Sequence, residues 1–337
     1  MRITRRTLLA AIAAAAPFGL TRASAQTDRW KLLDDGSGPL ARWDHVLTAD
    51  AANGRLYAFG GRDANGVALG DLWSFDLASS RWTPIESAGP SPRFGVAASA
   101  TPDGSAFVLF GGQADADFYA DLWTFDFASQ TWTLLDDGLA VAPTPRYGLG
   151  GAFDALGRFI VSHGFTFEGR FDDTWAFSGE TGWLDVSPTP ETRPLRRCLH
   201  EVTPIDNGER LLLYAGCSSG YGPCPQGDLW EYETASGTWT QLAPSIVPAA
   251  RSNPATAQLG DSVLLVGGQT EFGPAADVWY GARSSDGFEW QEATDDSGII
   301  APRSSHDLVT LDSEAYIFGG LGVAGPLADL WQYTSGA

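Results

Sequence analysis

A repeat of about fifty residues fills most of the chain, and it constrains the fold more than any other feature of the sequence. Each copy has a glycine pair, or a degenerate version of it, after a short apolar run. These pairs stand at residues 60–61, 111–112, 163–164, 215–216, 267–268 and 319–320. Their second members are 51 residues apart in the first step and 52 residues apart in the four later steps. A fixed period of this length indicates one structural unit that recurs along the chain.

Tryptophans keep the same period. An Asp-x-Trp follows each glycine pair, and its tryptophans are Trp73, Trp123, Trp175, Trp230, Trp279 and Trp331. A second tryptophan comes shortly afterwards in five copies, at Trp82, Trp132, Trp183, Trp239 and Trp290. Once Trp30 is included, twelve of the thirteen tryptophans occupy repeat positions. The repeated unit is therefore built around paired aromatic side chains.

Each unit is expected to form four short strands. In the second copy the first strand begins at Arg93, and the others cover residues 106–110, 122–125 and 131–134. These runs are short, apolar or alternating, and loops rich in Gly, Pro, Asp and Ser separate them. The glycine pair allows a sharp turn, because glycine adopts a positive φ at little cost. No long helix is expected outside the N-terminus, so the fold class is all-β.

These spaced motifs resemble the kelch repeat, whose signature is a glycine pair followed by a spaced aromatic pair. The resemblance covers residues 28–337, and six coordinated copies carry it. It implies a six-bladed kelch-type β-propeller with four-stranded blades.

The last copy ends soon after Trp331 and has no fourth strand of its own. Residues 29–33 (Arg-Trp-Lys-Leu-Leu) match the fourth strand of the second copy at residues 131–135 (Thr-Trp-Thr-Leu-Leu). We therefore expect residues 29–33 to complete the last blade beside residues 329–333. Closure of this kind pairs both open edges of the ring.

The N-terminus carries the features of an export signal. A twin arginine at residues 5–6 precedes an apolar run over residues 8–20, and small residues at 23–25 offer a cleavage site. Residues 1–25 resemble a twin-arginine signal peptide, and an ordinary secretory signal is the alternative. The expected domains are this signal and a propeller over residues 26–337, located in the periplasm or secreted.

Charge narrows the possible partners. The chain has 21 basic and 41 acidic residues and a net charge of -20. A nucleic-acid partner is excluded by this balance, since phosphate contacts need a basic face. The N-terminal run is the only long apolar stretch, so no membrane span is expected once the signal is removed. We expect a monomer whose partner is a protein or an anionic carbohydrate.

Candidate contact residues lie in the loops between second and third strands, which share one face of a propeller. These loops cover residues 62–70, 113–120, 165–172, 217–227, 269–276 and 321–328. The candidates are Phe118, Tyr119, Phe167, Glu168, Tyr221 and Glu271. Exposed aromatic and charged side chains on a rigid ring suit recognition. The alternative is that some of these aromatic side chains fold under their own loops.

An arginine also recurs at the start of every expected innermost strand. We call these six residues the ring arginines: Arg42, Arg93, Arg146, Arg197, Arg251 and Arg303. On a propeller they would surround the mouth of the central channel, where guanidinium groups suit a carboxylate or sulfate. The alternative is a structural role, in which each arginine bonds carbonyls or acids between blades.

Other chemistry-bearing residues are few. The four histidines come from different copies, so neither a metal site nor a cofactor is expected: His45, His163, His200 and His306. Cys217 and Cys224 flank one loop and are expected to form a disulfide in an oxidising compartment. Cys198 is expected to be buried and free.

Two functions from different classes follow. The first is an exported binding or protein-interaction module that uses the loop face. The second is an enzyme on small anionic sugars, because some exported six-bladed kelch proteins that this chain resembles are sialic acid mutarotases. In that case a ring arginine would hold the carboxylate, and Glu168 or Glu271 would move the proton.

Overall fold

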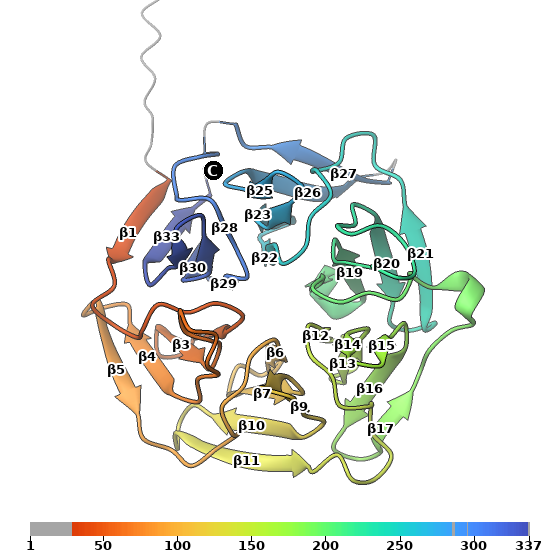
Figure 1. Cartoon of the computed structure of the whole chain (residues 1–337), viewed down its shortest axis with the longest axis horizontal. Helices are drawn as coiled ribbons and strands as arrows, with labels where there is room; N and C mark the ends of the chain where they lie inside the picture. Colours follow the sequence, from red (N-terminus) through yellow and green to blue (C-terminus); the bar gives the residue numbers. More distant parts are fainter. Residues whose placement is uncertain (1–28, 285–286, 295, 336–337) are drawn as a thin grey trace, which may run out of the picture.

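The computed structural model describes residues 29–284, 287–294 and 296–335 of the chain. Within these residues there are six four-stranded antiparallel sheets and no α-helix. The sheets stand side by side around a central axis (Figure 1), which is the arrangement of a β-propeller. The expected signal, residues 1–25, lies outside the described residues.

Each of the first five sheets is built from one continuous stretch of chain. Sheet 1 contains β2 (Val46–Asp50), β3 (Arg55–Phe59), β4 (Leu72–Asp76) and β5 (Arg81–Ile85). Sheet 2 contains β6 (Ala97–Ala100), β7 (Ala106–Phe110), β10 (Leu122–Asp126) and β11 (Thr131–Asp136). Sheet 3 contains β12 (Gly150–Phe153), β13 (Phe159–Ser162), β16 (Thr174–Ser178) and β17 (Gly182–Asp185). Sheet 4 contains β18 (Glu201–Ile205), β19 (Arg210–Tyr214), β20 (Leu229–Glu233) and β21 (Thr238–Leu242). Sheet 5 contains β22 (Ala255–Leu259), β23 (Ser262–Val266), β26 (Val278–Ser284) and β27 (Gly287–Glu292).

Sheet 6 combines the two ends of the described chain. It contains β29 (Asp307–Leu311), β30 (Glu314–Phe318), β33 (Leu330–Thr334) and, as its outermost strand, β1 (Trp30–Asp34). The register places Trp30 opposite Tyr333 and Leu32 opposite Trp331. The first strands of neighbouring sheets contact one another around the axis, and β29 contacts β2 as well as β22.

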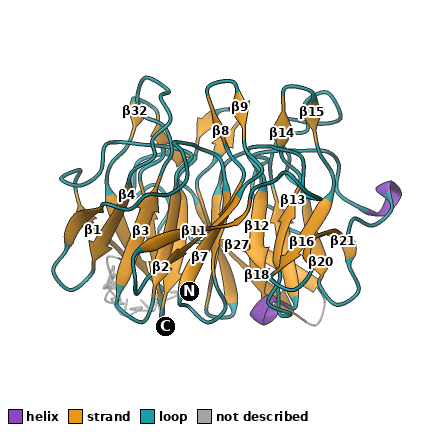
Figure 2. Ribbon diagram, turned by 90° about the horizontal axis from the view of Figure 1, so that it is seen from below, coloured by secondary structure: helices purple, strands orange, loops and turns teal. Residues whose placement is uncertain are grey.

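Short hairpins follow the second strand of several sheets and project from one face of the ring (Figure 2). They are formed by β8 (Gln113–Ala114) with β9 (Asp117–Phe118), β14 (Phe165–Thr166) with β15 (Gly169–Arg170), and β24 (Gln269–Thr270) with β25 (Gly273–Pro274). In sheet 6, β31 (Leu321–Gly322) pairs with β32 (Gly325–Pro326) and with β28 (Arg303–Ser304). Two single 3-10 turns, η1 (Pro190–Thr192) and η2 (Asp206–Gly208), complete the described elements. We call the face with the hairpins the loop face.

Packing between sheets explains the tryptophan pattern. The second strands are buried on both sides, as in β7, because each sheet lies between two others. Fourth-strand tryptophans reach the preceding sheet: Trp132 lies 5.2 Å from Phe59 and Trp183 lies 4.9 Å from Phe110, centroid to centroid. Trp30 is 6% exposed and belongs to the apolar cluster that spans sheets 5 and 6. Each buried tryptophan therefore ties two sheets together.

The glycine pair is explained by close backbone contacts. Gly60 and Gly61 have φ values of +65° and +90°. A Cβ atom at Gly60 would lie 2.6 Å from the carbonyl oxygen of Arg93, and one at Gly61 would lie 2.7 Å from Cβ of His45. In the degenerate copies the first position keeps a positive φ, at His163 and Ala215. The turn is thus kept even where glycine is replaced.

The sequence placed the start of the first strand too early. In the second copy β6 begins at Ala97, four residues after Arg93, and Phe94 forms only an isolated bridge with Gln113. The ring arginine therefore precedes the innermost strand and is not its first residue.

Candidate functional site

The six ring arginines form the same interior unit in every sheet. In sheet 1, Arg42 donates to both carboxylate oxygens of Asp71 at 2.8 Å and to the carbonyl oxygen of Gly60 at 2.9 Å. Its Nε donates to the carbonyl oxygen of Leu40 at 3.0 Å. Trp73 Nε1 donates to the same carboxylate at 2.7 Å. The arginine, the glycine pair and the Asp-x-Trp are therefore one hydrogen-bonded unit.

The main chain of the same unit connects neighbouring sheets. The second residue of each glycine pair donates its N–H to the carbonyl oxygen of the next ring arginine, as Gly61 does to Arg93 at 2.9 Å. The series ends with Gly320, which donates to the carbonyl oxygen of Arg42 at 2.8 Å. A motif that recurs six times thus has a structural reason to do so.

The six ring arginines are buried, and each is paired with a carboxylate. All six are at most 1% exposed, and each pairs with the aspartate of its own sheet: Asp71, Asp121, Asp173, Asp228, Asp277 and Asp329. Burial alone would raise the pKa of Asp277, but the hydrogen bond and charge of Arg251 outweigh burial and hold that pKa below its usual value. The same balance lowers the pKa of Asp228 beside Arg197.

The expectation that these arginines surround the channel mouth is therefore corrected. Their guanidinium groups point into their own sheets, and their bonds lie within one copy instead of between blades. Anion binding by them stays a prediction, and it would require an incoming anion to displace an aspartate.

A continuous arc of aromatic side chains crosses the loop face over sheets 1, 2 and 3. It starts where the guanidinium of Arg62 lies 3.7 Å from the ring of Trp43 and 4.1 Å from the ring of Phe94. Phe94 then meets Tyr147 edge to face at a centroid distance of 5.9 Å. Asp44 accepts hydrogen bonds from Arg62 and fixes it between the two rings.

The arc continues onto two hairpins. Tyr147 meets Phe165 at 5.6 Å, and Phe118 meets Phe167 at 4.9 Å. The guanidinium of Arg170 lies 5.3 Å from the ring of Phe165 and donates to the carbonyl oxygen of Ser219 in the next loop. We name the following set the aromatic arc: Trp43, Arg62, Phe94, Phe118, Tyr147, Phe165, Phe167 and Arg170.

The arc covers only one side of the ring. The residue after the ring arginine is Trp43, Phe94 and Tyr147 in the first three copies, but Cys198, Ser252 and Ser304 in the last three. All six positions make the same kind of backbone bridge, so the fold does not require an aromatic side chain there. Phe167 is 67% exposed. Phe94 is buried, and the other members of the arc are partly exposed. The arc is thus a feature added to the repeated framework, and Phe167 is its most accessible side chain.

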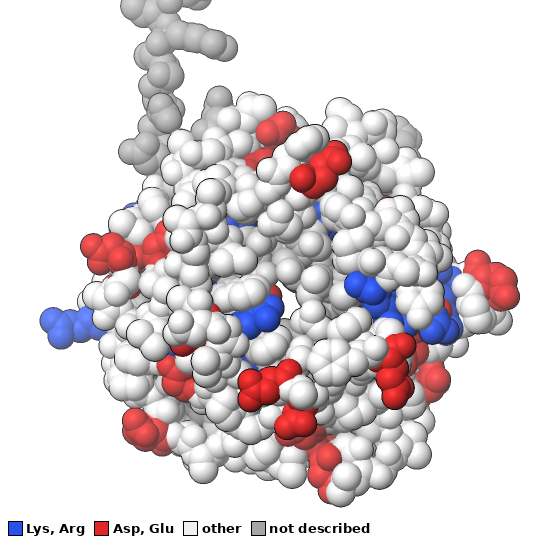
Figure 3. Space-filling view, viewed as in Figure 1, with Lys and Arg blue, Asp and Glu red and all other residues white. Residues whose placement is uncertain are grey.

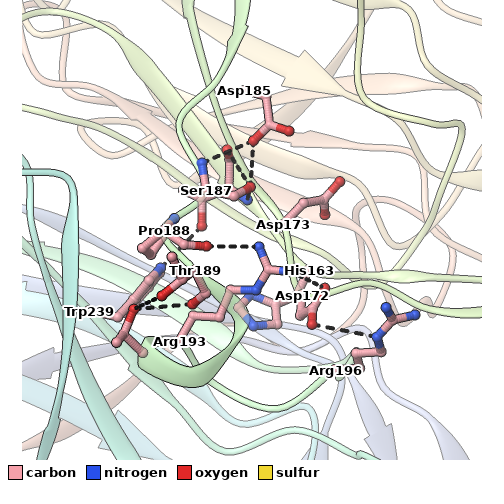
Figure 4. A network of polar contacts seen from close by, with 12 residues as sticks. His163, Asp172, Asp173, Asp185, Ser187, Pro188, Thr189, Arg193, Arg196 and Trp239 are labelled. Atoms are coloured by element: carbon pink, nitrogen blue, oxygen red, sulfur yellow. Dashed lines mark hydrogen bonds and ion pairs between the residues drawn. The ribbon is translucent and has the colours of Figure 1, made fainter.

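Further arginines lie beside the arc, at the border of sheets 3 and 4. Arg193 donates to a carboxylate oxygen of Asp172 at 3.0 Å and to the carbonyl oxygen of Pro188 at 3.2 Å (Figure 4). Arg196 pairs with the other oxygen of Asp172 at 3.5 Å, and its side chain is 47% exposed. Figure 3 shows basic side chains beside the central opening of this face. Acidic side chains lie on the same face, and Asp172 partly compensates the charge of the two arginines.

The central channel encloses about 550 Å³ and is lined by the first strands of the six sheets. Two of its acids, Glu201 and Asp307, stand at the first position of β18 and β29. Burial raises the pKa of Asp307 to about 6, although the N–H groups of Leu47 and Leu308 donate to its carboxylate. Burial, and then the charge of Asp307, raise the pKa of Glu201 well above its usual value.

The family is decided by comparison with known proteins. A family model described as the KLHDC2/KLHL20/DRC7 Kelch-repeats domain matches residues 19–216, which is more than half of the chain. The chain belongs to the kelch-repeat family. The resemblance inferred from the glycine pairs and tryptophans is thereby confirmed.

Individual relatives of this kelch chain match it in part. A segment of 73 residues is 37% identical to tRNA wybutosine-synthesizing protein 4 of Saccharomyces cerevisiae, covering 22% of this chain and 10% of that protein. Mouse multiple epidermal growth factor-like domains protein 8 is 25% identical over 281 residues, covering 75% of this chain and 10% of that protein. Bovine kelch domain-containing protein 3 is 28% identical over 136 residues, covering 37% of this chain and 35% of that protein. The matches span between a tenth and about a third of these relatives.

The six loop residues predicted to contact a partner lie in different surroundings. Phe118 and Phe167 belong to the aromatic arc. Tyr119 folds back over Arg93, 3.9 Å from its guanidinium, which is the alternative considered from the sequence. Tyr221 is 48% exposed, and its ring lies 5.4 Å from the guanidinium of Arg196.

Glu168 and Glu271 are both exposed, at the turns of the β14–β15 and β24–β25 hairpins. Within the described residues, the structure does not join either of them to a ring arginine. Their roles in the second of the two expected functions stay a prediction.

The kelch framework also contains the expected disulfide. Cys217 and Cys224 are bonded, with a Cα–Cα distance of 4.3 Å, and Cys198 is a buried free cysteine. The histidines pack between sheets: His45 lies edge-on to Phe318, and His163 lies edge-on to His200. Burial lowers the pKa of both His45 and His200 to about 3, so both are neutral near pH 7.

Residues 29–284, 287–294 and 296–335 show neither a metal-binding cluster nor a membrane-spanning helix. They hold no group of three or more His, Cys, Asp or Glu side chains placed to bind one metal ion. Nor do they hold a helix with the length and hydrophobicity that crossing a membrane requires.

Sequence reasoning missed Trp43, Arg62 and Tyr147, which lie outside the loops or were not singled out within them. A signal for Trp43 was present, because it is the one tryptophan of the thirteen that has no repeat position. No other copy has a tryptophan at this position, so the residue type is not explained by the repeat and indicates a specific role.

Proposed function

We propose that this protein is an exported interaction module that binds a partner protein through the aromatic arc. The observation that carries the proposal is the one-sided distribution of the arc. Three copies place Trp, Phe or Tyr directly after the ring arginine, and three copies place Cys or Ser there. Aromatic side chains and arginine are the residues that protein interfaces favour. Membership of the kelch-repeat family also supports a role in protein interaction.

The proposed scaffold is a six-bladed propeller in which each four-stranded sheet is one blade. Six sheets support this proposal, because the first strand of each sheet contacts the first strands of its two neighbours around the axis. The last blade is completed by β1, which pairs with β33. A ring of this kind holds the loops rigidly, which lowers the entropy lost when they bind a partner.

Export is proposed from the N-terminal residues 1–25 as a twin-arginine-type signal, with the periplasm or the exterior as destination. The disulfide between Cys217 and Cys224 is compatible with an oxidising compartment. We expect the mature protein to begin near residue 26 and to act as a monomer.

A binding experiment with two matched variants tests the role of the arc. Phe167→Ala removes a ring that is 67% exposed, and Phe272→Ala removes a ring that is 92% exposed on the β24–β25 hairpin of the same face. Each protein is immobilised and incubated with periplasmic and secreted fractions of the source organism, and bound proteins are quantified by mass spectrometry. We expect one partner to be retained by the wild type and by Phe272→Ala.

That partner should be reduced at least tenfold on Phe167→Ala, because central aromatic side chains of an interface contribute about 2 kcal/mol or more. Both variants should unfold at the wild-type temperature, since neither ring is buried. Equal retention by the two variants would contradict the proposal, and so would an equal loss.

A further inference from the structure

The three cysteines of the chain meet at one place on the loop-face side of sheet 4. Cys198 and Cys217 face each other in an antiparallel bridge, with N–H to carbonyl hydrogen bonds of 3.1 and 2.8 Å. The thiol of Cys198 lies 3.9 Å from the carbonyl oxygen of Cys217. Residues paired in this way have Cα atoms about 5.5 Å apart, a separation that a disulfide spans. Cys217 therefore has a second possible partner besides Cys224.

A positive charge lies at the same place. Arg170 donates from Nη2 to Cys217 Sγ at 3.5 Å and from Nη1 to the carbonyl oxygen of Ser219 at 2.6 Å. Burial raises the pKa of the Cys198 thiol, and the charge and hydrogen bond of Arg170 act against burial. The pKa of the thiol stays above its ordinary value, and Arg170 makes the thiolate, which is the form that attacks a disulfide, less costly than burial alone would.

We propose that Cys198 exchanges with the Cys217–Cys224 disulfide in the folded protein and that Cys224 is thereby a reactive thiol site. The Cys198 thiolate attacks Cys217 Sγ, and a Cys198–Cys217 bond forms as the Cys217–Cys224 bond breaks. The electron pair of the broken bond leaves on Cys224 Sγ, which takes up the proton that Cys198 gave to water. One disulfide and one thiol are present before and after, so no oxidant or reductant is needed.

Burial gives the exchange a direction. Cys198 is 2% exposed and Cys217 is 6% exposed, whereas Cys224 is exposed at the end of the loop. The attacking sulfur stays in the interior as part of a neutral disulfide, and the leaving thiolate enters water, where its charge is solvated. The exchange moves the free thiol from the interior to the loop face. A thiol there can be alkylated or can form a mixed disulfide with another thiol compound.

Alkylation of the native protein tests the exchange. The full chain, purified without reductant, is incubated with N-ethylmaleimide at pH 7 and pH 8, quenched in acid, and digested with pepsin at low pH to prevent further exchange. Peptide mapping then locates the label and the remaining disulfide. We expect the label on Cys224 together with a Cys198–Cys217 disulfide. The rate should rise up to about tenfold per pH unit while the thiol is mostly protonated. A label on Cys198 alone, or none before denaturation, would overturn the proposal.

Three variants separate exchange in the folded state from exchange after unfolding. Cys198→Ser has no free thiol, so it should take up no label. Arg170→Gln removes the charge next to the sulfur atoms and should slow the labelling of Cys224 at least threefold. Arg196→Gln removes a neighbouring charge for which no sulfur contact is observed, and it should label at the wild-type rate. An Arg170→Gln protein that labels as fast as the wild type would show that unfolding, and not the folded site, releases Cys224.

Discussion

The pairing of Arg251 with Asp277 predicts the effect of removing one charge from the interior. The arginine side chain is 0% exposed, and the aspartate side chain is 23% exposed. Asp277→Ala leaves Arg251 Nη2 without its carboxylate at 2.8 Å and also removes the acceptor of Trp279 Nε1. Breaking a buried ion pair from one side costs about 3–5 kcal/mol, and the partial exposure of the aspartate favours the lower end.

This loss in the free energy of unfolding can be converted into a shift of the melting temperature. The entropy of unfolding is about 2.1 cal/mol/K per residue, or about 0.6 kcal/mol/K for a domain of roughly 300 residues. A loss of about 3 kcal/mol therefore lowers the melting temperature by about 5 °C. Thermal unfolding at pH 7, followed by near-ultraviolet circular dichroism, measures the shift directly, since tryptophans of the same unit report on tertiary packing.

A double variant distinguishes an unpaired charge from lost packing. Arg251→Met together with Asp277→Ala removes both charges, and replacing a buried pair with apolar side chains is often close to neutral. We expect the double variant to unfold several degrees above Asp277→Ala. A single variant that loses less than about 1 °C would refute the reasoning, as would a double variant less stable than the single one. The first result would mean that Arg251 does not depend on Asp277, which would favour the anion-binding prediction. The second would mean that the contacts of Arg251 with the main chain outweigh the cost of its unpaired charge.

Two other perturbations address closure and the channel. Trp30→Ala should lower the free energy of unfolding by about 3–5 kcal/mol. Phe272→Ala should leave the melting temperature within about 1 °C of the wild type. Equal melting temperatures for the two variants would contradict the role given to β1. The raised pKa values of Glu201 and Asp307 mean that ionising these acids costs more in the folded state than in the unfolded state. The free energy of unfolding should therefore fall as the pH rises from about 4 through 6. Glu201→Gln should therefore raise the melting temperature at pH 8 and leave it unchanged at pH 4, and the reverse pattern would contradict the assignment.

The sequence was informative about the fold because the information is local and repeated. A glycine pair, an Asp-x-Trp and a second tryptophan recur at one period, and each maps onto a strand end or a contact between sheets. The match between residues 29–33 and 131–135 pointed to β1, and its pairing with β33 lies one residue from the expected place. Such a prediction needs no knowledge of side-chain direction.

The arginines show where this reasoning stops. Recurrence indicated that Arg93 has a role, but the direction of its side chain is set by contacts with residues distant in the sequence. Arg93 turns toward Asp121, and Tyr119 covers it. The pairing partner is 28 residues away in the sequence, so neither spacing nor alternation identifies it.

The same comparison separates the residues that build the ring from those free to serve a partner. A position that must be filled in every copy, such as the ring arginine, is fixed by contacts that repeat six times. The next position makes the same backbone bridge in all copies, yet it holds Trp43, Phe94 and Tyr147 on one side and Cys198, Ser252 and Ser304 on the other. The backbone bonds are identical, so they do not account for that difference. The partner contact proposed above would account for it, because the aromatic side chains lie on the side where we propose that the partner binds.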